Sequence, residues 1–437
     1  MRNYFQVSSV WTIGCMMGLV LTSHALAVSD EDFNTLKDQV SKQGGRIDQV
    51  EKTQAVATNT AAKSEVSVVQ PVYPASALGS SASHNFMMVG DAEVQFGKVE
   101  GQSSGFTFAD FAPIFLYRAS DSVLFEAGFD IGLQNGSTTL LNGQTHDSSS
   151  QTTIDLSFAQ LDYLLNDYAT IVAGYMLLPL GTYTERGAGW LNKIPDDPLP
   201  RALLQDSGIG VQIRGSIPLD DSGQVFTYAV YGVNGPSSVD GSGNSTTLDA
   251  GSNSIPNLDL GGNVGIKSDS TTANLHSSPS GGGRLGWFLP WKAHYDLELG
   301  VSGQSGAWDD AGKRLWSAGV LDAALHLSPY FEAKGECINT WQETDDIGTI
   351  RPRGFWIQAS YKLAALDMDL PIVNDVELVS RYDRTDDDMG TRTHRCTMGY
   401  VYYLSNTLLF EGDYESIGSD DPSQAHNDFV LQFSYGF

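Results

Sequence analysis

The sequence predicts an all-β fold, a transmembrane antiparallel β-barrel of about sixteen strands that follows a short helical segment. From about residue 85 onward, apolar and polar side chains alternate with the two-residue period of a β-strand, between turns rich in Gly, Asn, Asp and Ser. After residue 27 the sequence has no run of about eighteen apolar residues that could cross a bilayer as a helix. A chain that spans a membrane without such helices must close its sheet, because every backbone group in lipid needs an internal partner.

The first 27 residues are predicted to be a secretory signal peptide. Arg2 precedes an apolar stretch over residues 7–21, and Ala25-Leu26-Ala27 forms a small-x-small cleavage site. We therefore expect the mature chain to begin at Val28. A lipoprotein would use Cys15 instead, but Thr12 does not fit the sequence that such processing requires.

Two further segments precede the predicted barrel. Residues 28–54 are charged, and their apolar side chains recur at spacings of three and four, which predicts a short periplasmic coiled coil interrupted by Gly44-Gly45. A single amphipathic helix lying on a surface is the alternative interpretation. Residues 55–84 are rich in Ala, Thr, Ser and Val and predict a flexible linker, so the barrel is expected over residues 85–437.

The composition restricts the function. The chain has 46 glycines, a mean hydropathy of −0.18 and a formal net charge of −27. A barrel with a lipid-facing outside and an aqueous inside averages to such a polar value, because its apolar residues occupy every second position. The acidity argues against nucleic acid as a partner. Cys337 and Cys396 are isolated, so we expect no disulfide framework, and we expect no cofactor and no dedicated metal site.

Alternation and turn residues together place the strands. Short turns, among them Asn166-Asp167, Leu289-Pro290-Trp291 and Ser405-Asn406, alternate with longer Gly-, Ser- and Asp-rich loops. Bacterial barrels have an even strand number, short periplasmic turns and long external loops, so both ends of the barrel are expected in the periplasm. The strands are predicted at residues 86–98, 105–118, 122–134, 152–165, 168–178, 207–217, 224–233, 282–289, 293–303, 313–327, 329–341, 352–363, 374–384, 392–404, 407–417 and 427–437.

Assigning the more apolar face of each strand to lipid defines an inner face, because a charged side chain facing lipid at mid-membrane costs about 2–4 kcal/mol. The inner side chains are expected to line an aqueous pore, or, for any single member, to form a ladder of solvated wall charges. They include more acids than bases, which predicts a mild cation preference, unless the arginines gather opposite the acids as an anion-attracting stripe. The predicted pore-lining residues are Asp91, Glu93, Glu126, Asp130, Asp155, Arg214, Arg284, Asp296, Glu298, Glu332, Lys334, Glu336, Glu377, Arg381, Asp383, Arg395, Glu411, Asp413 and Glu415.

One long connection has a distinctive composition. Residues 179–206 are rich in proline and aromatic residues and therefore stiff. They are expected either to fold inward as a constriction, or to form an external lid or a subunit contact. The candidate constriction residues are Tyr183, Glu185, Arg186 and Trp190.

Acidic pairs recur in the predicted external loops, including Asp196-Asp197 and Asp386-Asp387-Asp388. They are interpreted as solubilising loop tips. Weak binding of Ca²⁺ or Mg²⁺, bridging to lipopolysaccharide phosphates, is the alternative.

The final strand carries large apolar side chains at every odd position from Phe429 to Phe437 and ends on an aromatic residue. It resembles the C-terminal strand by which bacterial outer-membrane barrels are recognised. Phe433, Tyr435 and Phe437 are therefore predicted to be an assembly signal for the barrel assembly machinery during insertion.

Further motifs resemble the sixteen-stranded trimeric porins, and among them the phosphate-selective porin O/P-like superfamily. These motifs are Ala173-Gly174-Tyr175 running into Leu178-Pro179-Leu180-Gly181, and the stretch from Val376 to Tyr382. The resemblance covers about residues 85–437 and implies a homotrimer in the outer membrane of a Gram-negative-type cell, in contact with lipid and lipopolysaccharide. An N-terminal coiled coil also occurs in that superfamily. Its phosphate selectivity is associated with a lysine ladder and an arginine cluster. The present chain has only eleven lysines, four of them before the barrel, so phosphate selectivity is not expected.

The sequence thus predicts an outer-membrane porin, a passive diffusion channel for ions and small hydrophilic permeants, with no catalytic residues. A structural or adhesion protein tethered to the cell wall is one alternative, and an anion-selective, phosphate-type channel is another. A hydrolase would need a nucleophile, a base and an orienting group in reach of one another. His294, His326, His394 and His426 are scattered, and no serine motif accompanies them.

Overall fold

The structure, a computed structural model, describes residues 85–101, 104–139, 145–186, 191–219, 222–236, 279–308, 312–344, 348–368, 370–422 and 425–437, and the short segments 258–259 and 263–264. The predicted signal peptide, coiled coil and linker lie outside these residues. Residues 82–437 form one compact unit.

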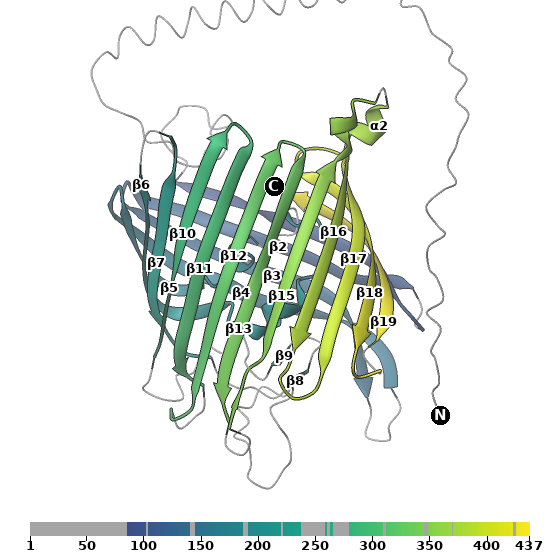
Figure 1. The fold of residues 1–437 in the computed structure, drawn as a ribbon, viewed down its shortest axis with the longest axis horizontal. Coiled ribbons are helices and arrows are strands. Elements are labelled where there is room, and N and C mark those ends of the chain that lie inside the picture. The colour runs from purple at the N-terminus through teal and green to yellow at the C-terminus, as the bar shows by residue number, and fades with distance from the viewer. Residues whose placement is uncertain are drawn as a thin grey trace, which may run out of the picture. The chain divides into compact units, whose positions relative to one another are not determined.

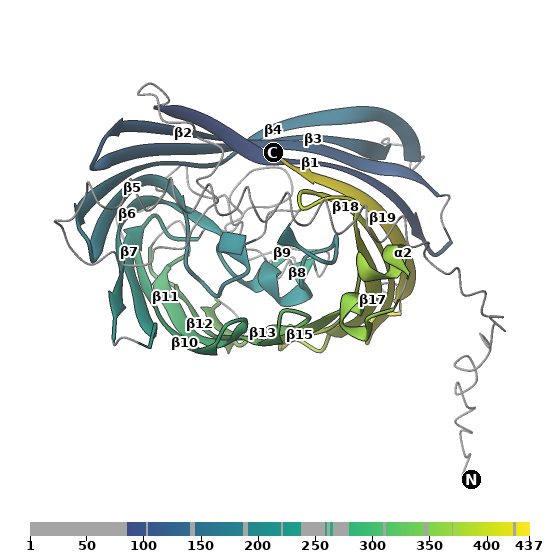
Figure 2. The same ribbon diagram turned by 90° about the horizontal axis from the view of Figure 1, so that it is seen from above.

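Sixteen long strands of the described chain form one closed antiparallel sheet, so the predicted fold class is confirmed for this part of the protein (Figures 1 and 2). Each long strand pairs with its neighbours in sequence order. The strands are β1 Phe86–Val99, β2 Gly105–Ser120, β3 Val123–Thr139, β4 Thr145–Asn166, β5 Ala169–Leu177, β6 Ser207–Pro218, β7 Val225–Val233, β10 Ser280–Lys292, β11 Tyr295–Ala307, β12 Leu315–Ser328, β13 Phe331–Glu343, β15 Arg353–Lys362, β16 Val376–Asp386, β17 Arg392–Tyr403, β18 Leu408–Ser419 and β19 His426–Gly436.

The first and last strands close the barrel. β1 pairs with both β2 and β19, and Asp91 lies opposite Gly436. Backbone hydrogen bonds between Gly90 and Phe437, at 2.9 and 3.1 Å, extend this pairing to the last residue. Closure leaves no free sheet edge, which is the condition that a spanning sheet must meet.

Three very short strands are additional to these sixteen, and two of them form a separate two-stranded sheet. β14 (Thr349–Ile350) pairs with the end of β13, and β8 (Leu258–Asp259) pairs with β9 (Asn263–Val264). None of the three is predicted from the sequence, because two residues are too few to show a period.

The connections differ at the two ends of the barrel. At one end, two to six residues join β2 to β3, β4 to β5, β6 to β7, β10 to β11, β12 to β13 and β17 to β18. The barrel begins and finishes at this end as well, as predicted. The connection from β15 to β16 is the exception there, because it carries the short helices η5 (Leu363–Leu366) and α2 (Pro371–Asn374) (Figure 1).

One predicted turn is wrong. Leu289-Pro290-Trp291 lies within β10, and the chain turns at residues 293–294 instead. The pairing of β10 with β11 shifts between Pro290 and Lys292, so Trp291 is accommodated in a bulge. Proline is tolerated at such irregular positions of a strand, which is why the Pro signal did not mark the turn.

The polarity of the two faces of the sheet is the reverse of that in a water-soluble protein, with apolar side chains outside and charged side chains inside. Along β16, Leu378 is 48% exposed, whereas the neighbouring Glu377 is 1% exposed and Asp383 is fully buried. The same alternation runs through β17, where Met398 is 65% exposed and Thr397 is buried. The outer face is therefore apolar, and the inner face holds the polar and charged side chains.

A bulge explains one departure from strict alternation. The pairing of β3 with β4 shifts at Gly128 and Phe129, where β4 contains the extra residue Ser157. Because an extra residue reverses the facing of the residues beyond it, Asp155 shares the inner face with Gln160 although an odd number of positions separates them.

Candidate functional site

The described residues between β5 and β6 fold into the barrel, where their short helices, drawn in teal, lie within the ring of strands (Figure 2). We call residues 178–206 the inner loop; residues 187–190 lie outside the described chain. The loop contains the helices η2 (Thr184–Arg186) and η4 (Leu199–Leu203). Of the two expectations for this segment, its contacts favour inward folding.

Apolar side chains hold one side of the inner loop against the wall. Four leucines of the loop are buried in a cluster with side chains from the inner faces of β5, β7, β12 and β13. This part of the interior is a packed apolar core, which the sequence assignment of a polar inner face did not predict. The cluster comprises Val172, Met176, Leu178, Leu180, Leu203, Leu204, Tyr231, Val233, Trp308, Trp316, Ala318, Val320 and Ile338.

The carboxylate of Glu336 on β13 accepts hydrogen bonds from the backbone at the start of the inner loop. Its Oε1 accepts hydrogen bonds from the backbone N–H groups of Thr182, at 2.6 Å, and Tyr183, at 3.0 Å. Its Oε2 accepts one from the indole N–H of Trp356, at 3.2 Å. Gly181 has a φ of +73°, and a Cβ there would lie 2.5 Å from Glu336 Oε1. Glycine is thus required both by the backbone conformation and by the close approach.

Lys193 fixes the middle of the inner loop to two strands. Its ammonium lies 2.8 Å from Glu332 Oε2 of β13 and 2.8 Å from Glu377 Oε1 of β16. Burial alone would lower the pKa of Lys193, but the two carboxylates outweigh it and raise the pKa above its ordinary value. Lys193 therefore stays charged at neutral pH and binds the loop to the wall.

Two arginines hold the tip of the inner loop through its backbone. Arg381 of β16 and Arg395 of β17 both donate to the carbonyl oxygen of Asp197. Their guanidinium groups also share Asp383 Oδ2, at 3.1 and 2.9 Å. Arg395 reaches Glu415 Oε2 of β18 at 3.2 Å. Both arginines are therefore largely neutralised by neighbouring carboxylates.

The side chain of Asp197 has partners within the loop itself. It accepts a hydrogen bond from the hydroxyl of Tyr183, at 2.9 Å, and forms an ion pair with Arg201. Arg201 also contacts Asp206 at 3.3 Å. Burial raises the pKa of Asp206, although Arg201 opposes this effect. These contacts give the loop a fixed internal structure.

The Asp196-Asp197 pair was interpreted from the sequence as part of an external loop tip, and this is wrong. Both residues lie in the inner loop and contact the arginines of β16 and β17. The sequence could not show this, because the pattern of an external loop and that of a loop folded inward are the same.

The wall formed by β1 to β4 is acidic. Its predicted inner carboxylates are joined by Asp110 and Asp162, which the sequence did not single out. Asp162 forms an ion pair with Arg214 at 2.6 Å, and Arg118 at the turn pairs with Asp121. The acids of this wall are Asp91, Glu93, Asp110, Glu126, Asp130, Asp155 and Asp162.

The remaining predicted residues form paired groups on β10 to β13. Arg284 makes a two-pronged contact with Asp322, which includes a 2.7 Å hydrogen bond from Nη2 to Oδ1. His326 lies 2.7 Å from Asp296, and Lys334 lies 3.6 Å from Glu332. Asp322 was missed because its inner-face neighbours Val320 and Ala324 are apolar, so the strand shows no polar face.

The candidate constriction residues have different positions. Tyr183 is buried and packs edge-on against Trp356, with ring centroids 5.8 Å apart. Arg186 is exposed, and its Nη2 donates to both carboxylate oxygens of Glu298, Oε2 at 2.8 Å and Oε1 at 2.9 Å. Glu185 is exposed, and Trp190 lies outside the described residues.

Three general features of the described residues complete the description. No helix among them is both long and apolar enough to cross a membrane. No group of three or more His, Cys, Asp or Glu side chains in the described ranges is placed to hold a metal ion. Cys337 and Cys396 are free, exposed and on strands that do not pair with each other.

No protein-family model matches this chain, and no curated protein matches it. Several solved structures are similar to it. An anion-selective porin from Comamonas acidovorans is 12% identical, with a TM-score of 0.49 over 80% of this chain and 99% of that one. OmpF of Salmonella typhi, in complex with daunomycin, is 11% identical, with a TM-score of 0.48 over 80% and 97%. The trimer form of OmpT, an outer-membrane protein of Vibrio cholerae, is 10% identical, with a TM-score of 0.47 over 80% and 99%.

Proposed function

We propose that this chain is an outer-membrane porin that lets ions and small hydrophilic solutes diffuse passively through its barrel. The observation that carries this proposal is the inverted polarity of a closed sheet. Leu378 and Met398 are exposed on the outside, while Glu377, Arg381 and Asp383 are buried on the inside. A water-soluble protein buries its apolar side chains and exposes its charges, so this arrangement suits a barrel whose outside contacts hydrocarbon.

The orientation proposed for the barrel follows from its connections. The shortest connections, of two residues each, and both barrel termini share one end, and the two longest connections, between β5 and β6 and between β7 and β10, share the other. By the general pattern of bacterial barrels, the short-turn end faces the periplasm and the other end faces the outside of the cell. The predicted homotrimer and the contact with lipopolysaccharide remain part of this proposal.

We further propose that permeation is passive and that the inner loop narrows the path. Lys193, Glu336 and the Arg381–Arg395 pair hold this loop to one side of the barrel. A permeant would then pass between the loop and the acidic wall of β1 to β4. A fixed loop and fixed wall charges sort permeants by size and charge without any bond chemistry.

The charges of the interior support a cation preference over an anion preference. The four arginines that could have formed an anion-attracting stripe are each paired with carboxylates. Arg214 contacts Asp162, Arg284 contacts Asp322, and Arg381 and Arg395 share Asp383. The carboxylates of β1 to β4 therefore dominate the field that a permeant meets.

Reconstitution in planar lipid bilayers tests the proposed function. The purified full-length protein is expected to give stepwise conductance increments in KCl. In a KCl gradient, the reversal potential is expected to have the sign that corresponds to preferred passage of K⁺. A folded protein that inserts but carries no current would contradict the channel, whereas a reversal potential of the opposite sign would contradict only the cation preference.

A further inference from the structure

Four carboxylates lie in a row on the inner face of β18 and β19. Glu411, Asp413 and Glu415 occupy alternate positions of β18 and therefore share one face. Asp428 of β19 lies directly opposite Glu415 in the register of the two strands. We call these four residues the acidic row. The inner loop approaches it with Asp196, whose side chain is 40% exposed.

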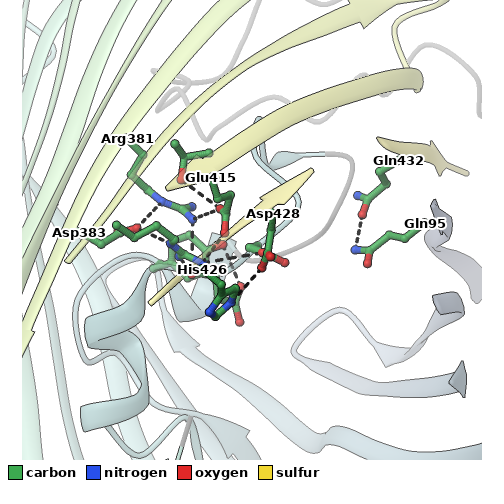
Figure 3. Close-up of polar contacts among 12 residues, drawn as sticks. Gln95, Arg381, Asp383, Glu415, His426, Asp428 and Gln432 are labelled. Atoms are coloured by element: carbon green, nitrogen blue, oxygen red, sulfur yellow. Dashed lines mark hydrogen bonds and ion pairs between the residues drawn. The ribbon is translucent and has the colours of Figure 1, made fainter. Parts of the chain in front are cut away.

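Three members of the acidic row have partners for part of their carboxylate. Glu411 Oε2 accepts hydrogen bonds from Gln432, at 3.1 Å, and Ser434, at 3.3 Å. Glu415 accepts from Thr397 at 3.0 Å and binds Arg395. Asp428 contacts His426 at 3.3 Å (Figure 3). One oxygen each of Glu411 and Asp428 is nevertheless buried without a hydrogen-bond partner in the described chain.

Asp413, in the middle of the row, differs from the other three. It is only 3% exposed, and neither of its carboxylate oxygens accepts a hydrogen bond from a side chain of the described residues; the backbone N–H of Val430, opposite it on β19, is the donor that acts on it. The charged groups that act on it include Asp196, Arg381 and Arg395. Both arginines are already engaged by Asp383, Glu415 and the carbonyl of Asp197.

Such a position is unfavourable without a further positive group. Burying a carboxylate costs several kcal/mol unless it is fully paired, and Asp413, whose neighbouring arginines bind other acceptors, is flanked by carboxylates on both sides. In this part of the interior, two guanidinium groups and the imidazole of His426 face seven carboxylates: Glu93, Asp196, Asp383, Glu411, Asp413, Glu415 and Asp428. The local charge therefore favours the entry of a cation.

We infer that the acidic row is a binding site for a protonated primary amine, centred on Asp413 and closed on the loop side by Asp196. This inference rests on the proposed function, because the amine reaches the site through the channel. An ammonium group carries three N–H donors, which suits the oxygens of Asp413 and its neighbours that accept no side-chain hydrogen bond.

The arrangement of the carboxylates favours an amine over a divalent metal ion. Calcium takes six to eight oxygen ligands that converge on one point. Successive inner positions of β18 are instead about 6.6 Å apart by the geometry of a strand. Carboxylates spaced in this way accept hydrogen bonds from separate N–H donors rather than forming one coordination sphere.

The experiment compares two monovalent organic cations of similar size as blockers of the K⁺ current in planar bilayers. Propylammonium donates three N–H hydrogen bonds, and tetramethylammonium donates none. Propylammonium is expected to block the wild-type channel about tenfold more tightly, which corresponds to one charge-assisted hydrogen bond. The variants Asp413→Asn and Asp196→Asn are expected to lose this difference, and Asp167→Asn, at the exposed turn between β4 and β5, is expected to keep it.

Each result bears on a separate claim. Equal block of the wild-type channel by the two cations would overturn the inference, and so would an unchanged difference in Asp413→Asn, because a protonated and uncharged Asp413 predicts that result. Should Asp413→Asn fail to insert, the wild-type comparison and Asp196→Asn still decide the question. Absence of any K⁺ current from the inserted wild-type protein would instead contradict the proposed function itself.

Discussion

At the scale of single residues, Lys193 is the side chain on which the position of the inner loop depends most. It joins the loop to Glu332 and Glu377, and Glu377 is almost completely buried. Replacing Lys193 by methionine leaves Glu377 as a buried carboxylate without its cation. Breaking a buried ion pair from one side costs about 3–5 kcal/mol, so Lys193→Met is expected to lower the thermal unfolding midpoint in detergent clearly.

Lys98→Met provides the matched control for this prediction. Lys98 is exposed on β1, and its replacement is expected to change the stability by no more than about 0.5 kcal/mol. Both variants can be followed by the temperature at which the folded species disappears from an unboiled gel. Equal midpoints for the two variants would show that the Lys193 ion pairs contribute nothing to stability.

At the scale of elements, the start of the inner loop depends on Gly181. A Cβ at this position would both adopt an unfavourable φ and meet Glu336 Oε1. Gly181→Ala is therefore expected to break the hydrogen bonds from Thr182 and Tyr183 to Glu336. The loop should then become accessible to trypsin at Arg186 and Arg201, while the strands stay resistant.

The control for Gly181→Ala separates backbone strain from the loss of the Glu336 contacts. Gly101 has a similar φ of +80°, but a Cβ there would meet no atom within 4 Å. Gly101→Ala is expected to leave the inner loop resistant to trypsin. Cleavage of the loop at the same rate in both variants would disprove the role assigned to Glu336.

The last strand permits a prediction about assembly. The ring of Phe437 stacks on Phe111 with centroids 5.6 Å apart, and its backbone pairs with Gly90. If Phe433, Tyr435 and Phe437 are the assembly signal, Phe437→Ala should reduce the yield of inserted barrel more than Phe429→Ala does. Phe429 lies near the other end of β19 and is exposed, whereas Phe437 is half-buried. Equal yields, measured from membrane fractions, would count against a signal at the C-terminus.

At the scale of the whole molecule, the acidic wall is expected to set the ion preference. Asp130 and Asp155 are paired across β3 and β4, and both are exposed on the inner face. Their joint replacement by asparagine removes two negative charges and should move the reversal potential in a KCl gradient toward zero. Asp121→Asn, at the turn between β2 and β3, is the control and should change it little. An unaltered reversal potential in the double variant would place the selective charges elsewhere.

Much of the barrel could be predicted from the sequence, because the alternation of side chains along a strand shows which of them face inward and which face lipid. Glu377, Arg381 and Asp383 alternate with Leu378 and Tyr382, and a charge that faces lipid is costly, so the pattern determines both the strand and its inner side. The same reasoning failed for Asp322, where both faces are largely apolar. It also failed for Trp291, because a bulge interrupts the period that the prediction relies on.

The partners of the inner side chains could not be predicted in the same way. Lys193 and Glu377 are 184 residues apart, and no local pattern indicates that they meet. The apolar core beneath the inner loop could not be predicted for the same reason, since Leu203 and Trp316 are brought together only because the loop turns inward.

The amino-acid sequence by itself determined the order of the strands, their even number and the polarity of their two faces. These features follow from the two-residue period of a strand and from the cost of placing a charge in hydrocarbon. Only the tertiary structure decided that the described part of the inner loop enters the barrel, that the arginines are already neutralised, and that Asp413 is left without a side-chain hydrogen-bond partner. These features depend on contacts between residues far apart in the chain, which exist only once the sheet has closed.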